Sequence, residues 1–583
     1  MLLVLDNLEQ VVAARTDLAA LLGRAPGLQV LATSRQALRT AGEREVPVGP
    51  LPVPATGDPV DAVGAAASVR MFVDRARARD HTFALTDDNT DVVAELCRRL
   101  DGLPLALELA AAHLRLFGPA GLLERLRNPL DLPATGMDLP ARQRTLRATL
   151  DYSHDLLTEP ERRLFARMAV FADGATLDAV DDVCADEGED VLEPLAGLLD
   201  QNLLTASGAR PATQPRLRML TPVREYALER LEARGEADLL RQRHLDHYRR
   251  LGRAAQPYLC GPRQRDWAAR WDGERADVRA AIATALDTGA LGIVLRLVWD
   301  AVVYYYIRDA VEEPRAWLGS VAAHRGALDE AERALLDVGL VVVGTPPPDR
   351  APGPMLRDAV DIVERHGLDL ETAVAWHYLG LHRWQVGDVD AAIDALDRSS
   401  RRYAAIDHDW GAAAVEATRG AVHAALGEPD RAIAHYQRSL DHSRAIDNRP
   451  QIAQALQGVA LVTAREGRLA EATRALDEAR ALVLAARSAT GTSYCLEALA
   501  ALALARDDGD VAIRALASAR AVRERLGIPA WTAAADAAAP VLDQARATVT
   551  AEHFAACWRA GADADPFALL AAGGTIDAAT AMS

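Results

Sequence analysis

An internal repeat of 40 residues constrains the fold of this chain more than any other feature of its sequence. Each unit contains a turn residue, then a small residue, then a large apolar or aromatic residue, at fixed spacing. The turn residues are Gly387, Gly427, Gly467 and Asp507, and the small residues are Ala392, Ala432, Ala472 and Ala512. Such a repeat is typical of helix hairpins, in which the small residue lets two helices approach closely. The sequence therefore predicts an α-solenoid.

A solenoid of this kind presents a concave surface made by the first helix of each hairpin. The predicted first helices carry polar and aromatic candidates for this groove, namely His377, Arg383, Trp384, Glu416 and Arg419. Spacing alone does not settle which of these side chains face inward. Because no credible catalytic arrangement occurs elsewhere in the sequence, we hypothesise that the groove binds a protein or peptide partner.

Composition limits the class of protein. The 583 residues exceed what one hydrophobic core supports, so we expect several domains. The formal net charge of −18 argues against a large nucleic-acid-binding surface, because such a surface needs positive charge. The five cysteines form no C-x-x-C pair, and no apolar run approaches the roughly 20 residues that span a bilayer. We therefore expect a cytoplasmic, mostly α-helical protein that does not contact a membrane.

The first 35 residues have a β-α-β pattern. Residues 2–5 form a short apolar run ending in Asp6, and residues 28–32 form a second run that is soon followed by Arg35. An aspartate at the end of a parallel strand can hold the water shell of Mg²⁺, and an arginine at the same sheet edge can reach a phosphate. Taken alone, an aspartate at a strand end is a weak indication. Since two parallel strands cannot bury themselves, we also expect an exposed edge beside residues 2–5.

The middle of the chain combines short helices with a strand pair. After a Pro-rich connector at residues 46–59, helical patterns cover residues 65–77 and 88–117, with a break at Gly102-Leu103-Pro104. Proline in the first turn of a helix is favourable local chemistry. Further helices are expected at 147–157, 159–171 and 191–201, followed by strands at 203–205 and 216–220. Three helices followed by a hairpin with a polar, Pro-containing loop predict a winged helix.

Five segments in this order resemble the NB-ARC or STAND family of signalling ATPases, in particular bacterial regulators with a winged helix and tetratricopeptide repeats. The segments are LLVLDNLEQV, LATSR, CRRLDGLPLALELAA, TLRATLDYSHDLLTEPERRLFARMAVFADGATLDAV and RLRMLTPVREYALERL. The resemblance implies that Asp6 is the magnesium-site aspartate of the Walker B strand, that Arg35 senses the γ-phosphate, and that Pro104 packs near the adenine. It further implies ADP or ATP with Mg²⁺ as the cofactor and an ADP/ATP-dependent switch in transcriptional regulation.

One departure from the family is complete. Met1 lies inside the Walker B strand, and all 65 basic residues are arginine, so the phosphate-binding loop G-x-x-x-x-G-K-[ST] cannot occur in this chain. We therefore expect no autonomous ATPase activity and no bound cofactor, with Asp6, Arg35 and Pro104 as a vestigial nucleotide site. Two alternatives stay open. One is an active switch ATPase whose loop lies upstream of the assigned start, and the other is a winged-helix DNA-binding regulator, although arginine and glutamate alternate on the last helix and wing.

The expected fold is mostly α, with a partial parallel α/β nucleotide-binding fragment, a helical domain, a winged helix and an α-solenoid of tetratricopeptide-like helix hairpins. The expected boundaries are 1–55 for the nucleotide-binding fragment, 56–130 for the helical domain, 131–235 for the winged helix, 236–350 for a helical linker, 351–545 for the repeats and 546–583 for a C-terminal tail.

Three further groups of polar residues receive a structural interpretation. Asp151, Ser153, His154 and Asp155 are neighbours on one helix and point in different directions, so a catalytic triad is not expected. His244 and His247 could hold a metal, but without a third ligand a solvated helix face is the simpler interpretation. The acidic run at residues 186–190 is interpreted as an exposed loop.

Overall fold

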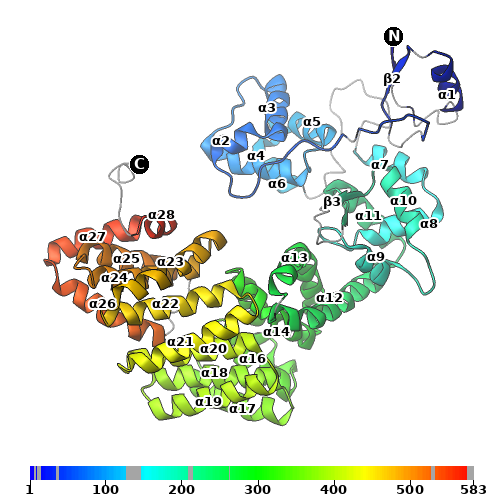
Figure 1. Ribbon diagram of the computed structural model, residues 1–583. Coiled ribbons are helices and arrows are strands. Elements are labelled where there is room, and N and C mark those ends of the chain that lie inside the picture. The colour runs from blue at the N-terminus through cyan, green and yellow to red at the C-terminus, as the bar shows by residue number, and fades with distance from the viewer. Residues whose placement is uncertain are drawn as a thin grey trace. The chain divides into compact units, whose positions relative to one another are not determined.

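The computed structural model describes residues 1–5, 8, 15–25, 27–34, 39–46, 48–126, 146–207, 215–261, 263–526 and 532–573 (Figure 1). It is mostly α-helical, as predicted, and divides into two compact units. The first unit comprises Met1–His247 and Glu274–Ala281, and the second comprises Tyr248–Gly273 and Ile282–Ser583. Two long helices, α12 (Ala237–Leu259) and α13 (Gln264–Asp287), contribute residues to both units.

The N-terminal fragment has the predicted β-α-β order. Strands β1 (Leu2–Leu5) and β2 (Gln29–Ala32) pair in parallel around α1 (Arg15–Arg24), and they are the strands that the structure describes in this sheet. One face of the sheet packs against the buried side chains of Leu8 and Leu18. On the other face Leu2, Val4 and Leu31 are exposed by 59%, 62% and 59%. The described strands therefore leave apolar surface uncovered, as two parallel strands must.

Over the described residues up to 126, the predicted helical domain consists of five helices. Gly102 separates two of them and adopts a φ of +64°, and a Cβ at this position would lie 2.0 Å from the carbonyl oxygen of Leu51. Glycine is therefore required both by the backbone conformation and by the close approach of the extended segment that precedes the domain. The helices are α2 (Val60–Ala65), α3 (Ala67–Arg79), α4 (Asp87–Arg99), α5 (Pro104–Ala112) and α6 (Leu114–Arg125).

Before the hairpin, the winged-helix region contains four described helices where three were expected. The side chain of Thr176 accepts a hydrogen bond from the backbone of Ala179 and begins α9, which is only eight residues long and was missed in the sequence. Ala175 also pairs with Leu217, next to the predicted hairpin. The elements are α7 (Leu146–Asp155), α8 (Glu159–Met168), α9 (Leu177–Cys184), α10 (Leu192–Asp200), β3 (Thr205–Ser207), β4 (Arg216–Arg218) and α11 (Thr221–Ala233).

The second unit contains the predicted solenoid. The small residues Ala392, Ala432, Ala472 and Ala512 are each 0% exposed, and the turn residues Gly387, Gly427, Gly467 and Asp507 adopt φ values of 79°, 75°, 74° and 63°. The first helices of the four hairpins are α18 (Asp369–Gln385), α20 (Asp409–Ala425), α22 (Arg449–Arg465) and α24 (Ala489–Leu504). The second helices are α19 (Val389–Ala405), α21 (Pro429–Ala445), α23 (Leu469–Ala486) and α25 (Gly509–Leu526).

Helices also flank the four hairpins on both sides. Before them come α14 (Leu291–Ile307), α15 (Glu312–Ala322), the short 3₁₀ helix η4 (Arg325–Ala327), α16 (Glu330–Val342) and α17 (Pro352–Arg365). After them come α26 (Thr532–Ala547), α27 (Ala551–Asp563) and α28 (Pro566–Ala571). The segment that we expected to be a C-terminal tail thus carries two helices, whose residues Cys557, Leu569 and Leu570 join the core of the repeats.

Candidate partner-binding site in the repeat array

The predicted nucleotide site is only partly covered by the structure. Asp6, expected to hold Mg²⁺, and Arg35 lie outside the described residues. Pro104 is the first residue of α5 and is exposed. Its position fits its expected role as a helix-starting proline, and its predicted contact with adenine stays a prediction.

The residues predicted for the groove are mostly engaged within the array. His377 is buried, and its Nε2 lies 2.9 Å from the hydroxyl of Thr418 on the next first helix. Arg383 pairs with Asp388 at 3.2 Å, and Arg419 pairs with Asp397. Trp384 is half-buried. His377 and Arg419 therefore join neighbouring hairpins, whereas Arg383 pairs within its own hairpin.

Glu416 makes buried charged contacts within its own hairpin. Its carboxylate lies 2.8 Å from Nδ1 of His435 and accepts a hydrogen bond of 2.7 Å from Nε of Arg438. Burial alone would raise the pKa of Glu416, but the hydrogen bonds from His435 and Arg438 lower this pKa to about 2. The charged carboxylate is therefore held inside the array as a structural group.

The chain's own α26 covers part of the concave face. This helix packs against α18, α20 and α24, which are all first helices of hairpins, and the buried side chains of Val541 and Ala545 belong to the core of the array. The groove that we predicted as a continuous binding surface is thus partly filled from within. A partner has access to what α26 leaves uncovered.

A cavity of about 50 Å³ is left between α14, α22, α23 and α24. Aromatic rings line two of its sides, through Tyr306 at the end of α14 and Tyr494 on α24, and Gln457 on α22 adds an amide. Tyr306 also makes an edge-to-face contact with Trp410, with ring centroids 6.0 Å apart. The other lining residues are Ile307, Asp309, Arg449, Pro450, Ala453, Gln454, Leu482, Val483, Ala486, Ser488, Thr490 and Gly491.

Two buried polar atoms at this cavity have no hydrogen-bond partner among the described residues: the hydroxyl oxygen of Tyr494 and Oε1 of Gln457. The amide nitrogen of Gln457 donates to the carbonyl of Gly491 at 3.0 Å, which fixes the side chain and directs Oε1 away from that bond. Leaving such an atom unpaired costs about 1–3 kcal/mol. A ligand group that donates to Gln457 and bonds to the tyrosine hydroxyl would recover this free energy.

The charges beside the cavity are themselves paired. Asp309 accepts a hydrogen bond of 2.9 Å from the hydroxyl of Ser488, which joins the end of α14 to the start of α24. The buried Glu497 pairs with Arg523 on α25. Burial, with a smaller effect from Asp309, raises the pKa of Tyr306 to about 12, so its hydroxyl stays protonated at neutral pH. The cavity therefore offers aromatic surface and the neutral groups of Tyr494 and Gln457, beside the charged side chains of Asp309 and Arg449.

Sequence reasoning missed Tyr494 and Gln457, although the repeat contained the necessary indication. Tyr494 occupies the position that Ala414 fills two hairpins earlier, and Gln457 occupies the position of Ala417. Such substitutions within a repeat are the places to look for binding residues.

A larger hollow of about 400 Å³ lies elsewhere in the second unit, at the start of α14. Its lining is mostly glycine, alanine and aliphatic residues, and Glu332 is its one charged member. The carboxylate of Glu332 already accepts a hydrogen bond of 3.0 Å from the backbone of Asp329 as part of a capping box. Size alone does not make this hollow a site, because its lining offers few directed polar groups.

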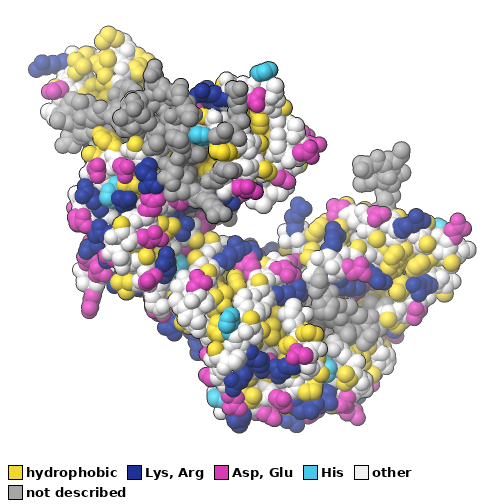
Figure 2. All heavy atoms as spheres, turned by 180° about the vertical axis from the view of Figure 1, so that it is seen from behind, with side chains coloured by type: hydrophobic (Ala, Val, Ile, Leu, Met, Phe, Trp, Pro, Cys, Tyr) yellow, Lys and Arg dark blue, Asp and Glu magenta, His cyan; other side chains and the backbone are white. Residues whose placement is uncertain are grey.

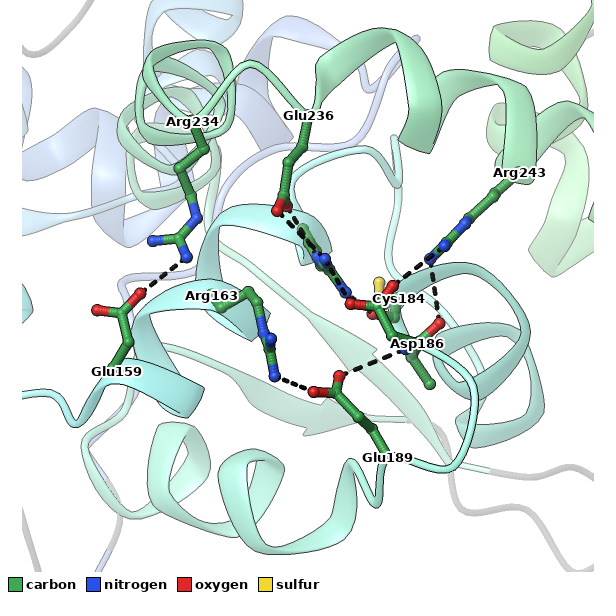
Figure 3. Close-up of polar contacts among 10 residues, drawn as sticks. Glu159, Arg163, Cys184, Asp186, Glu189, Arg234, Glu236 and Arg243 are labelled. Carbon is green, nitrogen blue, oxygen red and sulfur yellow. Dashed lines mark hydrogen bonds and ion pairs between the residues drawn. The ribbon is translucent and has the colours of Figure 1, made fainter.

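The winged helix has its own polar centre around Arg167. This side chain is 5% exposed and donates to the carbonyl of Cys184 at 2.7 Å, to Asp186 at 2.9 Å and to Glu236 at 2.8 Å. Figure 3 shows that Asp186 also faces Arg243 of α12, which donates to it at 3.0 Å. The hydrogen bonds from Arg167 and Arg243 lower the pKa of Asp186 although burial opposes them. The acidic run that we interpreted as a simple exposed loop therefore binds a buried arginine.

The two histidines of α12 were also misinterpreted. His244 and His247 are 1% and 8% exposed, so the predicted solvated helix face is wrong. Nε2 of His244 lies 3.1 Å from Asp277, and Nδ1 of His247 lies 2.8 Å from Asp182. Asp277 also accepts a backbone hydrogen bond of 2.6 Å from Ala172. The histidines have separate carboxylate partners and link α12 to the winged helix and to α13.

The residues that suggested a triad have different partners. Asp151 accepts a hydrogen bond of 2.7 Å from the hydroxyl of Tyr226, while Ser153 donates to the carbonyl of Thr149 at 3.0 Å. The ring of His154 packs against Phe165. Burial, followed by the charge of Arg162, lowers the pKa of His154. These contacts are structural.

The charge of the helix before the hairpin bears on whether the winged helix can bind DNA. In winged helices of the helix-turn-helix type this helix lies in the major groove. Here it is α10, with the sequence LEPLAGLLD, and its exposed charged residues are Glu193 and Asp200. On the face shown in Figure 2, basic and acidic side chains are interspersed over the described residues. Both exposed charged side chains of α10 are acidic, and negative charge beside a DNA phosphate is unfavourable.

Comparison with known proteins identifies two domains. Residues 157–232 match the model of the winged helix-turn-helix domain, and residues 371–445 and 411–485 match that of the tetratricopeptide repeat. The predicted winged helix and tetratricopeptide repeats are thus confirmed. Among the residues that the structure describes, no helix has both the length and the apolar character needed to cross a bilayer.

Similar curated proteins come from mycobacteria. A Mycobacterium tuberculosis protein described as "Putative HTH-type transcriptional regulator" is 37% identical over 343 residues, which are 57% of this chain and 37% of that protein. An uncharacterized M. tuberculosis protein is 39% identical over 252 residues, 42% of this chain and 61% of its own length. The chain thus spans less than two thirds of these relatives. The predicted resemblance to bacterial regulators with a winged helix and tetratricopeptide repeats is confirmed.

A solved structure is also similar, that of a Signal Transduction ATPase with Numerous Domains protein with a tetratricopeptide repeat sensor from Pyrococcus horikoshii. The TM-score is 0.39 at 14% sequence identity, and the similarity covers 93% of this chain and 80% of that one.

Proposed function

We propose that this chain is part of a cytoplasmic transcriptional regulator of the signalling type, in which the repeat array binds a protein or peptide partner. The observation that carries the proposal is the cavity with the unpaired hydroxyl of Tyr494 and Oε1 of Gln457. Its volume of about 50 Å³ fits one small side chain or a few backbone atoms of a partner. The tetratricopeptide repeat match supports binding of a protein, and the mycobacterial relative supports a role in transcription.

In this proposal the winged helix transmits the binding event. Asp186 and Ala172 of the winged helix bond to Arg243 of α12 and Asp277 of α13, and both helices continue into the second unit. A winged-helix DNA-binding regulator is the second candidate, supported by the domain match. The acidic α10 speaks against it, so DNA contact by other parts of the regulator is the more favourable arrangement.

We further propose that this chain by itself does not turn over ATP and binds ADP or ATP with Mg²⁺ weakly or not at all. The support is the absence of lysine from the sequence, since arginine replaces a compact charge with a planar fork. Calorimetric titration of the full chain with MgATP and MgADP checks this. Sub-micromolar affinity for ATP would contradict the proposal and favour the active switch ATPase.

Site-specific photo-crosslinking tests the partner-binding proposal. A photoreactive residue replaces Tyr494 in the full chain, and the crosslinked peptides are identified after irradiation in cells. The matched control replaces Tyr258, which is 37% exposed and stacks on Trp267 away from the cavity. We expect one partner to crosslink at position 494 and not at position 258. If no partner crosslinks at position 494, or if the same partner crosslinks equally at position 258, the proposal is wrong.

A further inference from the structure

A thiol, an imidazole and a carboxylate lie together where α27 packs on α25. Nε2 of His553 is 2.7 Å from Oδ1 of Asp510, and Sγ of Cys557 is 3.6 Å from the same Nε2. The three potential ligand atoms all lie within 4.8 Å of one another. Among the residues that the structure describes, these three side chains form the one group of histidine, cysteine or acidic residues whose spacing suits a metal ion. None of the three lines the repeat cavity.

The backbone fixes two of these side chains on one face of α27. His553 and Cys557 are four residues apart and therefore lie one above the other. Thr550 caps α27 and accepts a hydrogen bond of 3.3 Å from the backbone of His553. Gly561 follows after four more residues, and a Cβ there would lie 2.3 Å from the carbonyl oxygen of Arg514. Glycine thus lets the ligand-bearing face of α27 come close to α25.

The third side chain is held at the start of α25. Asp510 is the second residue of this helix, where the helix dipole favours an ionised carboxylate. The preceding Gly509 allows another close approach, since a Cβ there would lie 2.5 Å from the hydroxyl oxygen of Thr548. The carboxylate therefore stands on a rigid element facing α27, as a metal ligand should.

We propose that Asp510, His553 and Cys557 bind a zinc ion that joins α27 to α25. Thiolate, imidazole and carboxylate are the three ligand types that proteins use for Zn²⁺. Carboxylate-only sites suit Mg²⁺ or Ca²⁺, whereas a sulfur and a nitrogen ligand select zinc or a similar transition metal. Water completes a four-coordinate site on the solvent side, where His553 is exposed.

The distances fit tetrahedral coordination with a small adjustment. Zinc bonds of about 2.3 Å to sulfur and about 2.0–2.1 Å to nitrogen place these two ligands about 3.5 Å apart. The separation of Sγ and Nε2 is 3.6 Å. A nitrogen and an oxygen ligand stand about 3.4 Å apart in the same geometry. Nε2 and Oδ1 are 2.7 Å apart because a proton joins them, so His553 must move by less than an ångström when zinc replaces that proton.

Binding requires the thiolate of Cys557. Burial raises the pKa of this thiol, Asp510 raises it further, and the charge of Arg514 opposes both. Zinc therefore displaces a proton from Cys557, and the affinity rises with pH. The ion links the last hairpin of the array to the helix that covers its end.

Cobalt titration of the full chain tests this proposal, because Co²⁺ replaces Zn²⁺ and is coloured. The metal-free, reduced protein should develop a thiolate-to-cobalt charge-transfer band at one equivalent of Co²⁺, and one equivalent of Zn²⁺ should remove it. Cys557→Ser and His553→Gln should each weaken binding by at least about 100-fold, since even outer-shell groups are worth about 10–100-fold. His553 is exposed, so its variant should fold even if Cys557→Ser does not.

The matched control is Cys260→Ser, because Cys260 and Cys557 are both 7% exposed. This variant should keep the cobalt band. The proposal is wrong if the wild-type chain gives no charge-transfer band. It is equally wrong if the band persists in folded His553→Gln or Cys557→Ser, or if Cys260→Ser alone removes it.

Discussion

The winged helix and the repeat array are held together by different kinds of contact. Around Arg167 the partners are Cys184, Asp186 and Glu236, which are 17, 19 and 69 residues away in the sequence. In the array the small residues Ala392, Ala432, Ala472 and Ala512 are buried at the same position of each hairpin, 40 residues apart. The first region depends on a few long-range charged contacts. The second depends on many equivalent close approaches between helices. The loss of stability from one substitution is therefore a small part of the total, because the neighbouring hairpins keep their own contacts.

The largest effect should come from the winged helix. Arg167→Ala should lower the free energy of unfolding of this domain by about 3 kcal/mol, because a buried charge network loses its centre. Amide hydrogen exchange in α8 and α9 measures this locally. Arg163→Ala is the control, since Arg163 pairs with Glu189 at 33% side-chain exposure and such pairs contribute at most about 1 kcal/mol. If both variants lower the free energy of unfolding equally, the winged helix does not depend on the buried contacts of Arg167, and the proposed difference from the repeat array is wrong.

A smaller effect is expected when an array contact is overfilled. Ala432 is 0% exposed between α20 and α21, so Ala432→Leu should cost about 1–3 kcal/mol through overpacking. Ala434→Leu on the same helix changes an exposed position and should stay within about 0.5 kcal/mol. Urea denaturation of both variants compares them. A cost for Ala432→Leu no larger than that of the control would show that the array repacks freely.

The pH dependence of the winged helix gives a third comparison. Burial raises the pKa of Glu225 from 4.5 to about 7, the charge of Arg224 opposes this shift, and the charge of Glu229 adds to it. The folded domain therefore holds a proton that the unfolded chain releases between these values, and stability falls as pH rises from about 4.5 to 7. Glu225→Gln should remove this decline, measured as melting temperature against pH.

The control for this measurement is Glu187→Gln, because Glu187 is exposed in the same domain. The melting temperature of Glu187→Gln should fall with rising pH in the same way as that of the wild-type chain. A decline that survives in Glu225→Gln would assign the pH dependence to another group.

The difference between the regions also explains what the sequence could predict. The spacing of Gly387, Gly427 and Gly467 predicts the solenoid because each hairpin repeats the same local physics. The buried contacts of Arg167 and His244 depend on which distant carboxylate the fold brings near, and no local pattern encodes that. The short α9 was missed because eight residues are too few for a clear helical period.

The sequence predicted the type of site, a partner-binding repeat array, but not the residues that line it. A partner-binding array follows from the repeat, while His377 and Glu416 turned out to be held by Thr418 and His435 inside it. The covering of the groove by α26 could not be read from the sequence, because an alanine-rich helix packs on many surfaces. Tyr494 differs from Ala414 at the same repeat position, and its buried hydroxyl without a partner then marks it as a candidate binding residue.

Binding of the crosslinked partner to Tyr494→Phe tests the proposed function most directly, with Tyr258→Phe as the control. Removing the unpaired hydroxyl takes no hydrogen bond from the free chain, so the melting temperature should not fall. Partner affinity should fall by roughly threefold to tenfold, which corresponds to the loss of one hydrogen bond of about 1 kcal/mol. Unchanged affinity in Tyr494→Phe, with the same partner bound, would contradict the assignment of the cavity as the partner-binding site.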